Sequence, residues 1–294
     1  MANLQELHIE GHKLAVLSFN PDQAGPPVIL IHSIIASIYF WSPDLLAPFL
    51  NVGPCYSLSL PGHYPAAFPA GFAQASLTAD HLAHVMTGAI RQLVGTTPCI
   101  LVGHSTGGFA VLNIAAHTPE LARNVISISG FAQGRWTGLL GAYQRLTRSG
   151  PAGQWGFKAL LRLGHLERIY RATARFYVVD RATLAAYPNI QQTLHDSCLI
   201  FRNLSAREVI HYFATMPDID ISGMMSRIRV PTLILTGDRD PIVPPAQADV
   251  IAQRVANGAL IALHNVGHFP FYEQPTEYQR ALKDWMAINL RPMK

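Results

Sequence analysis

The sequence predicts an α/β protein built on a mostly parallel, doubly wound sheet of about eight strands, with an inserted helical segment. Short apolar runs alternate with segments whose apolar residues recur at three- and four-residue spacing, as when crossover helices join parallel strands. A strand, an abrupt turn and a helix follow one another around residues 103–107. From 131 to 222 the alternation lapses and only helical patterns remain.

Composition favours a globular protein with a large core. The 294 residues are 49% hydrophobic and 14% charged, which leaves little scope for disorder. The most apolar early run, 28–38, has about half the length needed to span a bilayer, and residues 1–20 lack the basic start of a signal peptide. We therefore expect a cytoplasmic protein.

The cysteines and histidines do not suggest a metal site. Cys55, Cys99 and Cys198 are odd in number and widely spaced, which predicts buried thiols in a reducing compartment. His81 and His84 are expected on a helix surface rather than as ligands. The net charge of +4 is modest and no basic run exceeds two residues, so we expect no nucleic-acid partner, no metal and no cofactor.

The first part of the chain reads as strands separated by helices. Segments 4–9 and 13–19 predict an antiparallel hairpin. The continuous apolar run 28–31 predicts a central strand buried on both faces, and 55–60 the next strand. Helices are expected from about Trp41 to Leu50 and over the periodic segment that ends at Gly95.

The pattern continues on both sides of the helical stretch. Strands are expected at 99–102, 125–129, 231–236 and 259–263, and helices at 108–117, 245–256 and 275–289. The last helix is expected to turn four apolar residues inward: Tyr278, Leu282, Trp285 and Ile288. Residues 1–130 and 223–294 then form the core domain, with 131–222 inserted in it.

The turn at 103–107 carries the strongest chemical signal. Gly103, His104, Ser105, Thr106 and Gly107 match G-x-S-x-G, in which a strained turn presents a serine hydroxyl at the top of a sheet. Glycine is needed two positions either side, because strand and helix cross too closely for side chains. By chance the pattern arises in roughly one such sequence in ten, but the flanking strand and helix are what the mechanism requires.

From Val28 to its end the sequence resembles the α/β-hydrolase family, with the helical insertion where that family carries a cap domain. The resemblance implies that Ser105 is the nucleophile, Asp240 in Gly-Asp-Arg-Asp-Pro the acid, and His268 in Val-Gly-His-Phe-Pro the base. A serine hydroxyl needs such a base to take its proton, and the carboxylate sets the tautomer of the imidazole.

Two alternatives lie close by. Asp238 could replace Asp240 and His264 could replace His268, but Asp238 sits nearer its strand and His264 lies at the end of one. We expect His32 and His104 to border the site. Together with these two histidines, two aromatic residues are predicted to lie nearest the substrate: Phe131 and Phe269.

The oxyanion formed during acyl transfer needs hydrogen-bond donors. The resemblance implies the backbone N–H groups of Thr106, after the nucleophile, and of Ile34, in the loop after the strand 28–31. Relatives usually carry His-Gly in that loop, whereas this chain has His32-Ser33. The Ser33 hydroxyl is therefore a further candidate donor.

A serine at this turn excludes the aspartate-nucleophile branches, the haloalkane dehalogenases and epoxide hydrolases. Hydrolysis of a carboxylic ester with a small or medium-chain acyl group ranks first, because it needs only the triad and the oxyanion donors. A thioesterase, lactonase, carbon–carbon bond hydrolase, perhydrolase or acyltransferase would use the same residues. A non-catalytic ligand receptor of the same fold is the alternative from another class.

The helical insertion is basic. Between 131 and 222 there are eleven lysines and arginines against six acids. An ordinary solvated face explains this charge. The alternative is that the insertion attracts an anionic partner, either a membrane surface or an acidic acyl carrier or thioester, above an apolar acyl pocket.

Overall fold

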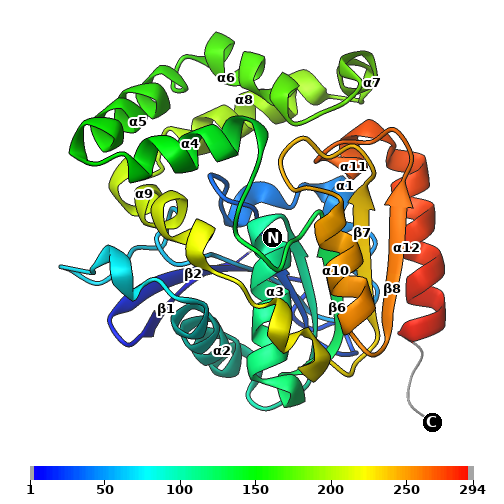
Figure 1. Cartoon of the computed structure of the whole chain (residues 1–294). Helices are drawn as coiled ribbons and strands as arrows, with labels where there is room; N and C mark the ends of the chain where they lie inside the picture. Colours follow the sequence, from blue (N-terminus) through cyan, green and yellow to red (C-terminus); the bar gives the residue numbers. More distant parts are fainter. Residues whose placement is uncertain (1–2, 291–294) are drawn as a thin grey trace.

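A computed structural model describes residues 3–290 and contains one eight-stranded sheet in the order β1-β2-β4-β3-β5-β6-β7-β8 (Figure 1). The strands are β1 (Asn3–Ile9), β2 (His12–Phe19), β3 (Val28–Ile31), β4 (Cys55–Leu58), β5 (Cys99–His104), β6 (Ala122–Ile128), β7 (Thr232–Gly237) and β8 (Gly258–Leu263). β1 pairs antiparallel with β2, and β2 antiparallel with β4. All other pairs are parallel, so the predicted fold class is confirmed.

Helices cover both faces of the sheet because alternate residues of each buried strand point to opposite sides. Ile29 and Leu101 belong to the apolar cluster under α2 (Ala79–Val94), α3 (Thr106–His117) and α10 (Ala246–Arg254). Leu30 and Ile100 belong to the cluster under α1 (Pro43–Leu46) and α12 (Pro275–Asn289). The continuous apolar runs in the sequence reflect this double burial.

Two local expectations were wrong. The helix expected from Trp41 to Leu50 is reduced to the single turn α1, with η1 (Ile38–Phe40) before it, because Pro48 has no backbone N–H to continue the helical hydrogen bonds. In α12 Ile288 is 69% exposed, whereas Met286 is buried beside Leu282. Ile288 lies about a quarter turn outside the buried stripe.

Six helices fill the segment between β6 and β7. They are α4 (Gly138–Arg148), α5 (Pro151–Leu163), α6 (Glu167–Thr173), α7 (Arg181–Ala186), α8 (Ile190–Phe201) and α9 (Ala206–Thr215). Figure 1 shows them together above the sheet. The ends of the segment meet where Gln133 pairs with Asp220 as an isolated bridge, reinforced by a 3.0 Å side-chain hydrogen bond. As the sequence predicts, no strand of the sheet comes from this segment.

The three cysteines are free and buried. Burial raises the pKa of Cys55 and of Cys99 to about 12, so both thiols stay protonated at neutral pH. Within residues 3–290 no helix is both long enough and apolar enough to span a membrane.

The crossing of β5 and α3 depends on backbone-to-backbone contact. A Cβ atom at Gly103 would lie less than 3.0 Å from the Gly107 carbonyl, and one at Gly107 would lie as close to the carbonyls of Ile31 and His32. Glycine is therefore required at both positions by lack of space.

We predict that Gly103→Ala lowers the free energy of unfolding by about 2 to 3 kcal/mol, because the added methyl group must push strand and helix apart. Urea unfolding measures the change. Gly223→Ala is the matched control, since no atom lies within 4 Å of a Cβ there. Equal stability of the two variants would contradict this account of the crossing.

Candidate active site

Ser105 stands at the turn between β5 and α3 in a strained backbone conformation, with φ 55° and ψ −115°. Its backbone N–H donates to the Ile128 carbonyl at 2.8 Å, which ties the turn to the end of β6. Residues other than glycine rarely hold a positive φ unless the surrounding structure imposes it. The turn places the hydroxyl at the carboxyl edge of the sheet, almost enclosed by protein.

His268 connects Ser105 to Asp240. Its Nδ1 lies 2.7 Å from Asp240 Oδ2 and its Nε2 lies 3.0 Å from Ser105 Oγ. Because an ionised carboxylate can only accept, Nδ1 carries the hydrogen and Nε2 is free to accept from the serine hydroxyl. Asp240 follows β7 and His268 follows β8, so three loops at the same edge of the sheet bring the three side chains together.

The second oxygen of Asp240 is also occupied. Asp240 Oδ1 accepts hydrogen bonds from the backbone N–H groups of Ile242 and Val243, at 2.8 and 2.9 Å. These bonds satisfy a buried carboxylate and aim its other oxygen at His268. Such a group can hold an imidazole in one tautomer.

The alternative acid and base pair with each other instead. His264 Nδ1 lies 2.8 Å from Asp238 Oδ2, and the His264 side chain is 93% exposed. Asp238 Oδ1 accepts from the Asn265 backbone N–H. Among residues 3–290, no hydrogen bond connects Asp238 or His264 to Ser105 or His268, so the structure separates the two pairs that the sequence leaves in competition.

The backbone around His268 is held from the helical segment, which sequence reasoning missed. The His268 N–H donates to the Tyr177 carbonyl at 2.7 Å. Glu273, buried in α11 (Pro270–Glu273), accepts from the N–H groups of Gly267 and Val179. Burial raises the pKa of Glu273. No pattern in the sequence marks Glu273, because its two partners are distant along the chain or on an irregular loop.

The oxyanion candidates lie beside Ser105. Thr106 is the first residue of α3, where a backbone N–H has no partner within its helix. For the described residues, the Ile34 N–H makes no hydrogen bond. Ser33 and Ile34 line the same cavity as Ser105. The next residue, Ile35, has a φ of 52°, which is rare for a β-branched side chain and marks a strained loop.

His32 anchors this loop and does not reach the cavity. Its Nδ1 donates to the Ser33 carbonyl at 2.8 Å, and its Nε2 accepts from the Leu60 N–H at 3.1 Å. His104 also lies outside the cavity wall, because its Nε2 donates to the His268 carbonyl at 2.9 Å and its ring stacks on Phe40. We expected these two histidines to lie nearest the substrate. The structure instead places them behind the cavity wall, where they support the backbone of the site.

Of the two aromatic candidates, only Phe269 lines the cavity. Phe131 is fully buried, stacks on Phe109 at 5.2 Å and meets the edge of Trp136. It packs into the core where the chain leaves β6, which corrects its assignment as a substrate-facing residue.

The cavity above Ser105 has a volume of about 670 Å³. Its wall combines the loop after β3 and η1 with helices α4 to α8 and with His268 and Phe269. The residues that line it include no lysine or arginine. Its two carboxylates, Asp44 and Asp196, are exposed, so they lie at its rim. The basic residues of 131–222 therefore contribute no positive charge to the cavity wall. The attraction of an anionic partner stays a prediction, and it concerns the outer surface.

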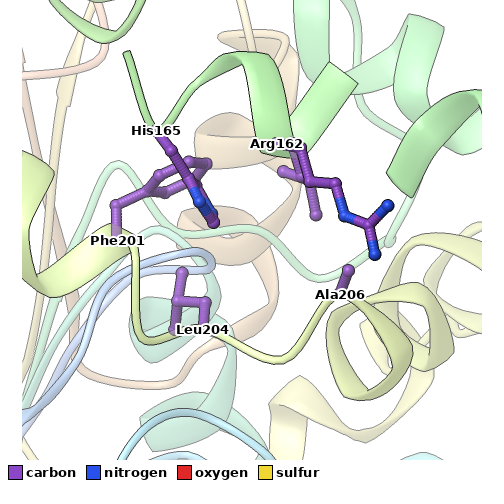
Figure 2. Close-up of a pocket in the computed structure, with 6 residues that line it drawn as sticks. Arg162, His165, Phe201, Leu204 and Ala206 are labelled. Atoms are coloured by element: carbon purple, nitrogen blue, oxygen red, sulfur yellow. The ribbon is translucent and has the colours of Figure 1, made fainter. Parts of the chain in front are cut away.

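A second, smaller crevice of about 190 Å³ lies between the end of α5 and the connection from α8 to α9 (Figure 2). Figure 2 shows the rings of His165 and Phe201 side by side, with Arg162 across from them. Leu161 and Phe201 line both the crevice and the large cavity. Of these two cavities, only the larger is lined by Ser105 and His268, so the candidate site lies there.

The described residues contain no group of three or more His, Cys, Asp or Glu side chains arranged to hold a metal ion. His81 and His84 each have a local partner: His81 Nε2 lies 3.0 Å from His12 Nε2, and His84 contacts Glu10.

Comparisons with known proteins show which family and fold the chain resembles. A family model described as the alpha/beta hydrolase fold matches residues 26–275. The chain is 26% identical over 265 residues to RutD of Pseudomonas savastanoi pv. phaseolicola, named as a carbamate hydrolase, covering 89% of this chain and 93% of that protein. It is 23% identical over 273 residues to the pimeloyl-[acyl-carrier protein] methyl ester esterase of Neisseria meningitidis serogroup B, covering 90% and 94%.

Among solved structures, the enol-lactonase of Burkholderia xenovorans LB400 superposes with a TM-score of 0.75. The two chains are 16% identical, and the match covers 96% of this chain and all of the other. At this identity the similarity establishes the fold alone.

We predict that acidification destabilises the protein because four buried histidines are neutral when folded. Burial lowers the pKa of His12 and His63 to about 4 and of His32 to about 3, and holds the pKa of His104 well below its usual range. The unfolded chain, with pKa values near 6.5, then binds more protons. The free energy of unfolding should fall between pH 6.5 and 4 by up to about 1.4 kcal/mol per pH unit for each histidine.

Urea unfolding of the wild type and of His63→Gln at pH 7, 6 and 5 checks this origin. The variant removes one titrating group, so its stability should depend less steeply on pH. Parallel pH profiles for the two proteins would rule out His63 as a contributor.

Proposed function

The chain belongs to the α/β-hydrolase family, and from this premise we propose that it is a serine hydrolase that cleaves carboxylic esters of small or medium-chain acyl groups. The observation that carries the proposal is the pair of hydrogen bonds that connects Ser105 to His268 and His268 to Asp240. Ser105 and His268 also line a cavity of about 670 Å³. Ester hydrolysis ranks first because it needs no group beyond these residues and the oxyanion donors. The similarity to a methyl ester esterase supports an oxygen ester as substrate.

In the first half-reaction Ser105 Oγ attacks the acyl carbon while His268 Nε2 takes the serine proton. Asp240 accepts from Nδ1–H throughout and stabilises the imidazolium that forms. The N–H groups of Ile34 and Thr106 donate to the oxyanion of the tetrahedral intermediate. When the intermediate collapses, His268 returns the proton to the departing alcohol, which leaves an acyl group on Ser105.

In the second half-reaction a water molecule attacks the acyl carbon, and His268 takes one of its protons. Collapse of the second tetrahedral intermediate releases the carboxylic acid, while His268 returns the proton to Ser105 Oγ. Ser105 and His268 end in their starting protonation states.

We also propose that residues 131–222 act as a cap on a core made of 1–130 and 223–294. The support is the composition of the cavity wall, which includes Leu140 and Leu161 from this segment and Ser33 and His268 from the core. Substrate specificity would then depend on both parts.

The first test is covalent. An activated phosphonate ester should label Ser105 once per chain and abolish esterase activity, as detected by mass spectrometry of the peptide that contains it. Ser105→Ala should lower turnover on the order of a millionfold, since the acyl-enzyme can no longer form. Labelling of another serine with loss of activity would contradict the assignment.

The second test separates the two carboxylates. Asp240→Asn should lower kcat by about ten-thousandfold, because the amide can donate to Nδ1 and favours the wrong imidazole tautomer. Asp238→Asn is the matched control, since Asp238 pairs with the exposed His264. It should leave kcat within a few-fold of the wild type. The reverse order of the two effects would identify Asp238 as the acid.

A further inference from the structure

Three tyrosines from separate elements line the wall of the large cavity. Tyr143 comes from α4, Tyr170 from α6, and Tyr177 follows η4 (Ala174–Phe176). The ring centroid of Tyr177 lies 6.2 Å from that of His268 and 5.4 Å from that of Phe269. Tyr177 is therefore next to the group that would take the serine proton.

The three phenols line one cavity and are neutral. Burial, followed by the neighbouring phenols of Tyr143 and Tyr170, raises the pKa of Tyr177. Burial also raises the pKa of Tyr143, and that of Tyr170 to about 12. Each phenol therefore keeps its proton at neutral pH and can donate a hydrogen bond.

Two of the three hydroxyls have no protein partner. Tyr170 has the Ser197 side chain as a hydrogen-bond partner. Among residues 3–290, no hydrogen bond is made by the hydroxyl of Tyr143 or Tyr177. Neither oxygen is among the unpaired polar atoms that protein encloses completely, so both are open to the cavity. An unpaired hydroxyl in a largely apolar cavity is costly unless water or a ligand satisfies it.

The surroundings indicate which ligand group suits these donors. The cavity wall carries no lysine or arginine, and its two carboxylates lie at the exposed rim. A carboxylate on the ligand would lose its hydration without gaining a cation, and would meet Asp44 or Asp196 on entry. A ketone, ether or hydroxyl oxygen needs only the two phenol donors.

We propose that the hydroxyls of Tyr143 and Tyr177 bind a second, uncharged oxygen of the substrate, so that the preferred substrates are neutral esters with an additional ketone, ether or hydroxyl oxygen a few bonds from the ester carbonyl. The inference rests on the proposed function, because it assigns the substrate class of the same site. Tyr143 and Tyr177 are then specificity-determining residues, and the Ser105–His268–Asp240 chemistry is unchanged.

The experiment compares esters of equal length with and without the second oxygen. Suitable probes are p-nitrophenyl hexanoate with its 3-, 4- and 5-oxo derivatives, and hexanoate esters of butanol and of 2-methoxyethanol. For the wild type, kcat/KM should be at least about fivefold higher for one oxygenated ester than for its alkyl counterpart. Tyr143→Phe and Tyr177→Phe should each reduce this ratio toward one.

Tyr278→Phe is the control. The Tyr278 hydroxyl is also buried and unpaired, but Tyr278 belongs to the sheet-facing side of α12, away from the cavity. The ratio should not change in this variant. Absence of any preference in the wild type would overturn the inference. A preference that survives in both cavity variants would also overturn it.

Binding to Ser105→Ala distinguishes this inference from the proposed function. Calorimetry with the same esters should give a lower Kd for the oxygenated member, and Tyr177→Phe in the Ser105→Ala background should remove the difference. If no ester is hydrolysed by the wild type but the Kd difference is present, the esterase proposal fails, whereas the binding of an uncharged ligand oxygen by the two phenols stands. If esters are hydrolysed without any Kd difference, the substrate class fails alone.

Discussion

The close crossing of β5 and α3 is the constraint on which the rest of the site depends. Gly103 and Gly107 allow the two backbones to touch, and this contact holds Ser105 at a positive φ. The strain of that conformation is offset by the packing of a strand and a helix that are both buried. The position of the Ser105 hydroxyl at the sheet edge then defines where the proposed base, the proposed oxyanion donors and the cavity have to be.

The helical segment takes part in positioning the base as well as in enclosing the cavity. The Tyr177 carbonyl accepts from the His268 backbone N–H. Glu273 accepts from the N–H of Val179 in the helical segment and from the N–H of Gly267, next to His268. Movement of the segment would therefore alter both the cavity wall and the loop that carries His268. The same stretch presents the Tyr177 phenol to the cavity, so one structural element both lines the cavity and holds the backbone of His268.

Sequence reasoning was most successful where a signal is local. The double burial of β3 and β5 produces continuous apolar runs, and Gly103 is required by its contact with Gly107, four residues further along the chain. It was weakest where two residues of one type lie close together, as with Asp238 and Asp240. It failed for Phe131, because an aromatic residue after a strand can face a cavity or the core, and only packing against Phe109 decides.

The sequence by itself determined the fold class and the identity of the turn, because strand burial, helix periodicity and the strand–turn–helix pattern around Ser105 are each expressed within a few residues. Only the tertiary structure decided that Asp240 pairs with His268, that His32 and His104 support the backbone, and that Tyr143 and Tyr177 share a cavity without cations. These relations join residues from different loops and helices. They depend on the path of the chain in space, which local periodicity does not encode.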